Sequence, residues 1–118
     1  MILHIDTTKN NQVVIAVKYN NKQIITKKLA MLRKQAEKLL LEIDKLFKNK
    51  KIKLKDIKKI EVKNKGGSFT SLRIGVIIAN TLGYALNIPV VGFDGKTKVA
   101  KNKNNQKFSI VEPIYDQE

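Results

Sequence analysis

The chain has 118 residues, 42% of them hydrophobic, which is enough for one domain with an ordinary buried core. It contains no cysteine, which excludes a disulfide framework and thiolate chemistry, and its formal net charge is +14. No apolar run approaches the roughly 20 residues of a membrane span, and the first residues lack the basic start and cleavage site of a signal peptide. We therefore expect a cytoplasmic protein with no membrane contact.

Three antiparallel strands are predicted at the start of the chain. Ile2 to Asp6 is a short apolar strand, and apolar residues alternate from Val13 to Tyr19. Asn20-Asn21 favours a tight hairpin, because asparagine tolerates the left-handed backbone conformation. Lys22 to Lys28 is then expected to be the return strand.

Two helices and two further strands are predicted next. Apolar residues recur every three or four positions from about Leu29 to Lys48, which indicates a helix. A short strand follows within Ile57 to Lys63, then a helix from about Thr70 to Leu86 and a strand from Pro89 to Phe93. Residues 95–106 are rich in lysine and asparagine and are expected to form a polar loop. The predicted order is therefore β-β-β-α-β-α-β.

The positive charge has two interpretations. The basic residues are 22 lysines and only two arginines, beside 11 asparagines and 15 isoleucines. Lysine, asparagine and isoleucine have AT-rich codons, so genome composition explains much of the charge as a solvated surface. A surface that binds RNA is the other interpretation. Because the lysines are spread along the sequence and aromatic residues are scarce, we expect tRNA to be bound only weakly or indirectly.

The second predicted helix carries a stripe of small residues, Gly75, Ala79 and Gly83, at four-residue spacing. An internal glycine costs a helix roughly 1 kcal/mol relative to alanine. Close approach of another backbone would offset that cost. The approaching element is either the domain's own sheet or the helix of a partner, and the sequence leaves both open.

Two turns are candidate ligand sites. Asp6-Thr7-Thr8 follows the first strand, where a carboxylate could organise a metal and phosphates, but the same residues form Asx turns that only join strands. The Gly66-Gly67 pair before the second helix could bind an anion or simply form a tight turn. His4 is the only histidine and is expected to be a packed or edge residue. Since only Asp6 lies at a strand end, nuclease chemistry with two metals is not expected, nor is any metal site, cofactor or catalytic residue.

The segment Gly66-Gly67-Ser68-Phe69-Thr70-Ser71-Leu72-Arg73-Ile74-Gly75 resembles the signature Gly-Pro-Gly-Ser-Phe-Thr-Gly-Leu-Arg-Ile-Gly of the TsaB (YeaZ) family. The match holds for Gly67 to Thr70 and for Leu72 to Gly75, and it departs at Lys65, Gly66 and Ser71. The resemblance implies a ribonuclease-H-like lobe of the actin-like ATPase superfamily, an α/β domain with a mixed five-stranded sheet. It covers residues 1–93, with a weaker echo at Pro113-Ile114-Tyr115 near the end of the chain.

Family members normally carry a second lobe, which the resemblance places where this chain has only residues 94–106. Residues 107–118 would then be a C-terminal segment. The family supplies non-catalytic partners in the formation of threonylcarbamoyladenosine in tRNA, so the resemblance implies a heterodimer with a TsaD-type catalytic subunit, formed through the two helices. A homodimer through the same face, a nucleotide- or anion-binding domain and an RNA-surface binder remain alternatives.

The interface residues expected on this basis lie on the two predicted helices: Leu32, Ala36, Leu72, Gly75, Ala79 and Gly83. The signature loop, Gly67 to Thr70 with Arg73, would support them. The arginine is notable in a chain with eleven times as many lysines, since its fork-shaped group suits a carboxylate or carbonyl. That carboxylate or carbonyl lies either within the domain, which we favour, or on a partner. Asp6, Thr7 and Thr8 would be a vestigial phosphate or metal turn.

Overall fold

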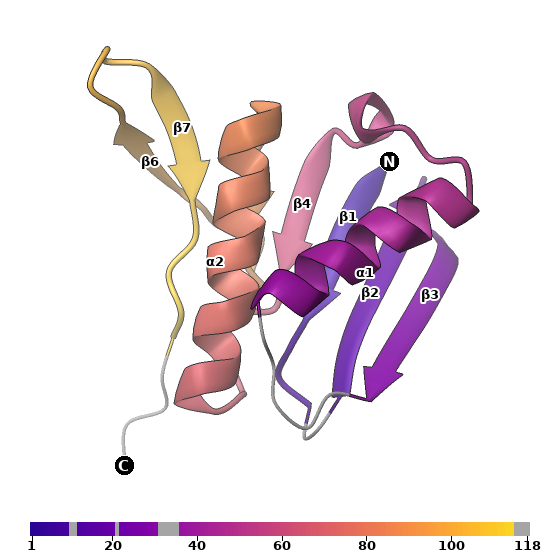
Figure 1. Cartoon of the computed structure of the whole chain (residues 1–118). Helices are drawn as coiled ribbons and strands as arrows, with labels where there is room; N and C mark the ends of the chain where they lie inside the picture. Colours follow the sequence, from indigo (N-terminus) through magenta and orange to yellow (C-terminus); the bar gives the residue numbers. More distant parts are fainter. Residues whose placement is uncertain (10–11, 21, 31–35, 115–118) are drawn as a thin grey trace.

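A computed structural model describes residues 1–9, 12–20, 22–30 and 36–114. Within these ranges a sheet of five strands carries two helices on one face, and a separate hairpin lies beside the second helix (Figure 1). The elements are β1 (Ile2–Asp6), β2 (Gln12–Tyr19), β3 (Lys22–Ala30), α1 (Ala36–Asn49), η1 (Leu54–Asp56), β4 (Lys59–Val62), α2 (Phe69–Leu86), β5 (Val90–Val91), β6 (Lys98–Lys101) and β7 (Lys107–Ile110).

The sheet has the strand order β3-β2-β1-β4-β5. β1 pairs antiparallel with β2 and parallel with β4, so the carboxyl ends of β1 and β4 meet at one edge. The predicted mixed five-stranded α/β sheet is confirmed, and its order is that of a ribonuclease-H-like lobe. None of the helices in the described ranges is long and apolar enough to cross a membrane.

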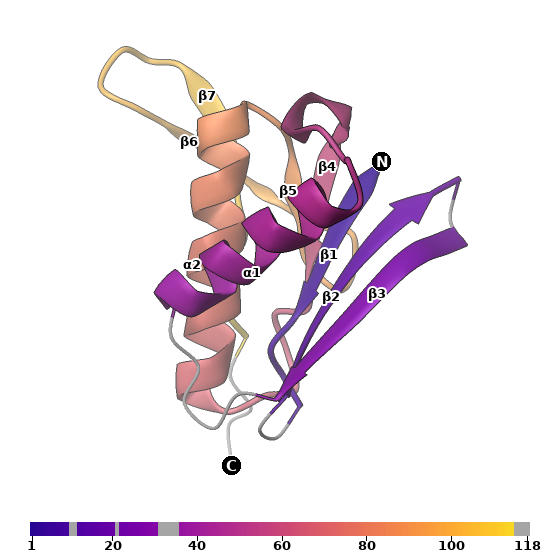
Figure 2. The same ribbon diagram turned by 45° about the vertical axis from the view of Figure 1, so that its right-hand side comes forward.

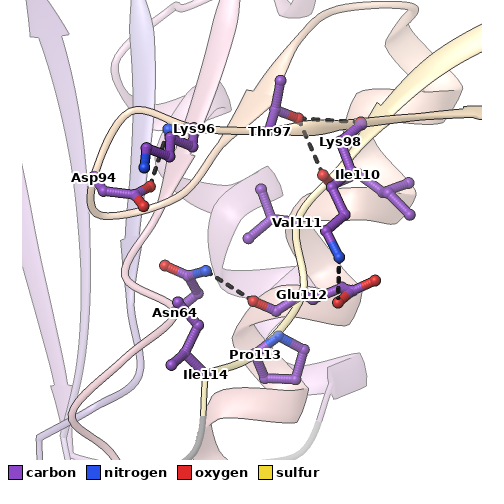
Figure 3. Close-up of a pocket in the computed structure, with 10 residues that line it drawn as sticks. All are labelled: Asn64, Asp94, Lys96, Thr97, Lys98, Ile110, Val111, Glu112, Pro113 and Ile114. Atoms are coloured by element: carbon purple, nitrogen blue, oxygen red, sulfur yellow. Dashed lines mark hydrogen bonds and ion pairs between the residues drawn. The ribbon is translucent and has the colours of Figure 1, made fainter.

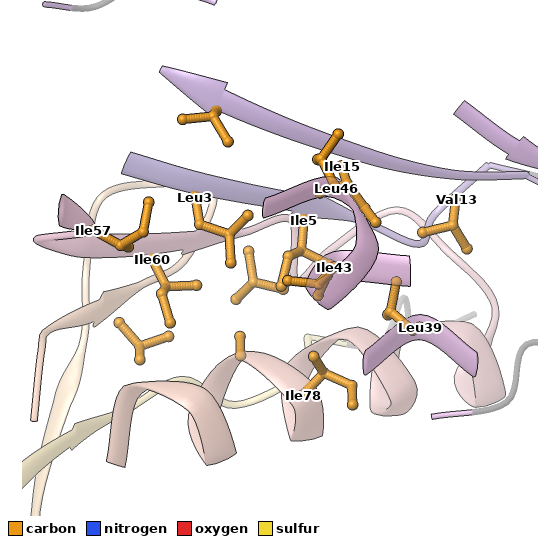
Figure 4. Close-up of a cluster of buried hydrophobic side chains, with 14 of the residues drawn as sticks. Leu3, Ile5, Val13, Ile15, Leu39, Ile43, Leu46, Ile57, Ile60 and Ile78 are labelled. Atoms are coloured by element: carbon orange, nitrogen blue, oxygen red, sulfur yellow. The ribbon is translucent and has the colours of Figure 1, made fainter. Parts of the chain in front are cut away.

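The core fills the space between the sheet and the two helices (Figure 4). Alternate residues of β1, β2 and β4 point toward it, while Leu39, Ile43 and Leu46 of α1 and Ile78 of α2 close it from the other side. These side chains are almost completely buried, and each contributes roughly 1.5–3 kcal/mol relative to an exposed position. Packing of this core fixes where α2 begins, and hence where its first turn meets the sheet.

Two of the predicted boundaries are wrong. Leu29 does not begin the first helix, because it lies in β3, where it pairs with Val13 on the inner face of the sheet. The 95–106 segment is not only a loop, since β6 lies within it and pairs with β7 as an antiparallel hairpin. The backbone of Asn20 has a left-handed φ of 52°, as the predicted hairpin requires, and Asn21 lies outside the described residues.

Candidate functional site

The Asp6-Thr7-Thr8 turn lies directly beneath the first turn of α2. Asp6 is buried, and its Oδ1 accepts hydrogen bonds from the backbone N–H of Thr8 at 2.8 Å and from the Thr8 hydroxyl at 2.5 Å. Thr7 is fully buried, and its hydroxyl donates to the carbonyl oxygen of Ser71 at 2.6 Å. One carboxylate oxygen is thus used within the turn, and the Thr7 hydroxyl fixes α2 to the sheet. This geometry is an Asx turn that joins two elements, the alternative to a metal or phosphate site.

The signature loop packs against the same turn. A Cβ atom at Gly67 would lie 2.9 Å from the Cα atom of Thr8, so only glycine fits at this approach. Ser68 caps α2, because its hydroxyl oxygen accepts a hydrogen bond from the N–H of Ser71 at 3.2 Å. Phe69 begins the helix, although its side chain lies outside the described residues, and Thr70 is exposed. The two segments that the sequence singled out therefore form one structural unit.

The small-residue stripe of α2 faces the domain's own sheet. A Cβ atom at Gly75 would lie 2.6 Å from the Thr7 hydroxyl oxygen, and one at Gly83 would overlap a methyl group of Val90. Ala79 between them has no exposed surface. Of the two interpretations of the stripe, internal packing is the one that the structure has. The assignment of Gly75, Ala79 and Gly83 to a partner interface is therefore wrong.

Among the remaining residues expected at a partner interface and Arg73 of the signature segment, the side chains that the structure describes lie in different environments. Leu72 is fully buried in the first turn of α2, so it also belongs to the interior. Leu32 lies outside the described residues, and Ala36 begins α1 with a side chain that is not described. Arg73 is exposed, one turn along α2 from Phe69.

The outward side of α2 carries residues that the sequence reasoning missed. Arg73, Ile77 and Thr81 are exposed at four-residue spacing, and Thr70 and Tyr84 extend the same side at seven-residue spacing from Ile77. Ile77 stands where the two rows cross and is 52% exposed. The signal in the sequence was Ile74, Ile77 and Ile78, more isoleucines than one face of the helix can bury.

The adjoining helix α1 adds two more apolar residues. Leu41 is 58% exposed and Leu40 is 37% exposed, while α1 crosses close to α2 (Figure 2). We call the set Leu40, Leu41, Thr70, Arg73, Ile77, Thr81 and Tyr84 the exposed helix face. The face combines a few apolar side chains with hydroxyls and one arginine, a composition suited to a protein surface rather than to a small ligand.

The opposite side of the sheet is polar. The carboxylate oxygen Oε1 of Glu61 in β4 lies 3.0 Å from the imidazole Nδ1 of His4. The same oxygen accepts a hydrogen bond from the ammonium of Lys18 at 2.8 Å. Burial alone would raise the pKa of Glu61, but the hydrogen bonds from Lys18 and His4, together with their charges, lower it below the ordinary value. His4 is therefore engaged with a carboxylate in the middle of the sheet. Among the described residues no group of three or more His, Cys, Asp or Glu side chains could hold a metal ion.

The chain is similar to a known family and to named proteins of two bacteria. Residues 9–109 match the family model described as TsaD: tRNA N6-adenosine threonylcarbamoyltransferase. The chain is 34% identical over 92 residues to the "tRNA threonylcarbamoyladenosine biosynthesis protein TsaB" of Buchnera aphidicola subsp. Schizaphis graminum. It is 36% identical over 61 residues to the protein of the same name from Bacillus subtilis. The chain belongs to the family of this model, and the predicted TsaB (YeaZ) assignment is confirmed.

Two solved structures from Pseudomonas aeruginosa share the fold of this chain. A YeaZ structure from Pseudomonas aeruginosa superposes with a TM-score of 0.67 at 22% identity over 77% of this chain. A second crystal structure, of an uncharacterized protein similar to peptidase YEAZ from the same organism, gives 0.68 at 23% identity over the same share. The matches cover 43% and 41% of those two chains, 43% of the Buchnera protein and 26% of the Bacillus protein. This chain thus spans less than half the length of the TsaB relatives that it matches.

The C-terminal segment returns to the TsaB-like lobe and is held there by two asparagines, which the sequence reasoning also missed. Asn80 of α2 donates to the carbonyl oxygen of Val111 and accepts from its N–H, both at 2.8 Å. Asn64, buried after β4, donates to the carbonyl oxygen of Glu112 at 2.7 Å and accepts from the N–H of Phe93 at 3.0 Å. Asn80 could have been singled out from the sequence, because it is a polar residue within the otherwise apolar pattern of α2.

These contacts border an open cleft of about 390 Å³ between the hairpin and the C-terminal segment (Figure 3). Asn64 lies on one wall, and the ion pair between Lys98 and Glu112, 2.9 Å long, crosses the other. The amide group of Asn64 already bonds the backbone on both sides. The cleft therefore results from the way in which the C-terminal segment is attached, and its polar groups bind the protein itself.

Proposed function

We propose that this chain is a non-catalytic partner that binds a TsaD-type subunit and supports it in the modification of tRNA to threonylcarbamoyladenosine. Membership of the family supports the pathway, since the relatives carry that biosynthesis in their names. The observation that carries the partner role is the exposed helix face. Ile77 lies at its centre, half exposed in a helix whose inward side is fully packed.

The proposed contact uses the outward side of the two helices. In the family that the signature resembles, these helices pack against their counterparts in the catalytic subunit. On this chain such packing would bury Ile77 and Leu41, with the exposed residue Arg73 one turn before Ile77 on α2. Buried apolar anchors near the centre of an interface contribute most of its binding energy.

The absence of catalysis by this chain alone is part of the proposal. Asp6 is the carboxylate at the expected strand end, and its Oδ1 is bonded within the turn. The hydroxyl of Thr7 donates to Ser71, so it is held by the helix. A nucleotide- or anion-binding role for this turn would require these bonds to be given up, and no observation favours it.

The test is co-expression with the TsaD-type protein of the same organism, followed by size-exclusion chromatography. The wild-type chain should co-elute with that protein. Ile77→Glu should weaken the complex at least about 30-fold, the equivalent of ~2 kcal/mol, because a carboxylate would be left unpaired in the buried interface. Its thermal unfolding should change little, since position 77 is half exposed in the free chain.

Leu54→Glu is the matched control, because Leu54 is 51% exposed on η1 and lies outside the exposed helix face. This variant should still co-elute with the partner. A folded Ile77→Glu variant that binds as tightly as Leu54→Glu would contradict the proposed face. If the chain without partner elutes as a dimer that Ile77→Glu dissolves, and the TsaD-type protein does not bind, the face serves a homodimer and the proposal is wrong.

A further inference from the structure

Lysines gather at one end of the molecule. The connection from α1 to β4, residues 50–58, and the turn of the β6–β7 hairpin, residues 102–106, lie at the same end in both views (Figures 1 and 2). Six of the 22 lysines fall within residues 48–58 and five within 95–107, so a fifth of the sequence carries half of them. The two segments lie on opposite sides of the end of α2. We call the following eight lysines the basic end: Lys50, Lys51, Lys53, Lys55, Lys58, Lys101, Lys103 and Lys107.

One acidic residue, Asp56, lies in the two segments 50–58 and 101–107 that carry the eight lysines. All eight side chains are exposed, and none forms an ion pair with a residue in the described ranges. Lys101 and Lys107 stand directly opposite each other in the hairpin register. Like charges at such a position destabilise a strand pair, so this pair costs the hairpin stability instead of adding to it.

Helix ends account for only part of this concentration. α1 ends at Asn49, and α2 ends at Leu86 between the two lysine segments, so the negative ends of both helix dipoles lie nearby. That attraction falls off within the last turn, where it favours Lys48, Lys50 and Lys51. It does not extend to the hairpin. Codon bias would scatter lysines over the whole surface, whereas here they gather at one end.

We propose that the basic end binds the phosphate backbone of RNA. Lysine ammonium groups are compact point charges on flexible stems, which neutralise phosphates without reading bases. The aromatic residues at the hairpin are one pair, Tyr84 and Phe108, which pack edge to face on each other with ring centroids 4.9 Å apart instead of presenting a row of parallel rings to successive bases. Binding is therefore independent of sequence and steeply dependent on salt. None of the eight lysines belongs to the exposed helix face, although the two surfaces adjoin at Tyr84, whose ring packs on Phe108 of the hairpin. Binding of RNA at the basic end goes beyond the partner role.

The test is fluorescence anisotropy of the full chain with an unmodified tRNA transcript from about 50 to 300 mM salt. Lys55→Gln/Lys103→Gln/Lys107→Gln should reduce the slope of log K against log salt by about 2–3, because each lost phosphate contact removes close to one counterion. Affinity near 100 mM salt should fall about tenfold or more. Lys28→Gln/Lys38→Gln/Lys65→Gln is the matched control, with the same charge change at exposed positions away from the basic end.

The control triple should bind tRNA nearly as the wild type does, and both triples should melt within a few degrees of it, because exposed substitutions change stability little. Equal losses in the two triples would show binding by net charge alone and overturn the proposal. So would binding to phosphatidylglycerol vesicles without binding to tRNA. Ile77→Glu should keep the tRNA affinity of the wild type, so failure of the partner proposal and failure of this one can be told apart.

Discussion

Thr7 attaches the start of α2 to the sheet through a single hydroxyl. The hydroxyl bonds to Ser71 and occupies the space in which a side chain at position 75 would lie. A glycine that costs the helix roughly 1 kcal/mol is therefore retained because the sheet approaches the helix there. The same approach explains Gly83 against Val90 at the other end of α2. At the scale of single residues, the stripe determines how closely helix and sheet pack.

We predict that Gly75→Ala lowers stability despite the better helix propensity of alanine. Overpacking costs about 1–3 kcal/mol, which exceeds the gain in propensity, so the melting temperature should fall by several degrees. In a Thr7→Ala background the hydroxyl and methyl are gone and only the Cβ at 3.4 Å remains. The same change should then be neutral or stabilising, which thermal denaturation of the four proteins would measure. An equal loss in both backgrounds would contradict the contact.

The hairpin and the C-terminal segment are attached to α2 through side chains more than through a continuous sheet. Asn80 bonds both backbone groups of Val111, and Ser109 accepts the N–H of Val90 through its hydroxyl at 2.8 Å. Tyr84 adds the ring contact with Phe108. At the scale of elements, α2 is therefore the common support of the sheet, the hairpin and the exposed helix face.

We predict that Asn80→Ala loosens the C-terminal segment without unfolding the lobe. Two hydrogen bonds to buried backbone groups are lost, which should cost about 1–3 kcal/mol. Hydrogen exchange at the Val111 amide should become markedly faster, while amides of β1 stay protected. Asn80→Asp keeps the acceptor for Val111 N–H and should give an intermediate rate. Unchanged protection at Val111 in the alanine variant would contradict this role.

The whole chain forms one core in which the last described residues take part. Val111 is buried among residues of the sheet and helices, although the family resemblance covers only residues 1–93. Asn64 ties the end of β4 to both Phe93 and Glu112. At this scale the basic end and the exposed helix face share no residue and adjoin at Tyr84, which would allow a protein partner and RNA to be bound side by side.

We predict that a chain of residues 1–93 is clearly less stable than the full chain. The truncation removes Val111 from the core and leaves Asn64, Asn80 and the Val90 N–H without their partners from the C-terminal segment. Urea denaturation followed by circular dichroism should show a lower midpoint, with a loss of several kcal/mol. A midpoint equal to that of the full chain would mean that the lobe is independent of its C-terminal segment.

Because alternation and three-to-four periodicity reflect local geometry, the sequence by itself determined the five strands of the sheet and their order with the two helices, but not the β6–β7 hairpin. It also determined the signature loop, where Gly66 at a positive φ of 94° and the Ser68 cap are local requirements of the turn before α2. It could not place Leu29, which suits a helix face or a strand face equally until its pairing with Val13 is known. The predicted start of α1 at Leu29 is wrong for that reason.

Only the tertiary structure decided what the helices face. Gly75, Ala79 and Gly83 are the same pattern whether a sheet or a partner helix lies against them, and the buried neighbours Thr7 and Val90 settle the choice. Ile77 became a candidate because packing covers the other side of α2. The lysines looked dispersed in the sequence, yet folding brings two distant segments to one end. In each case the arrangement depends on packing between residues far apart in the chain, so no local pattern could have specified it.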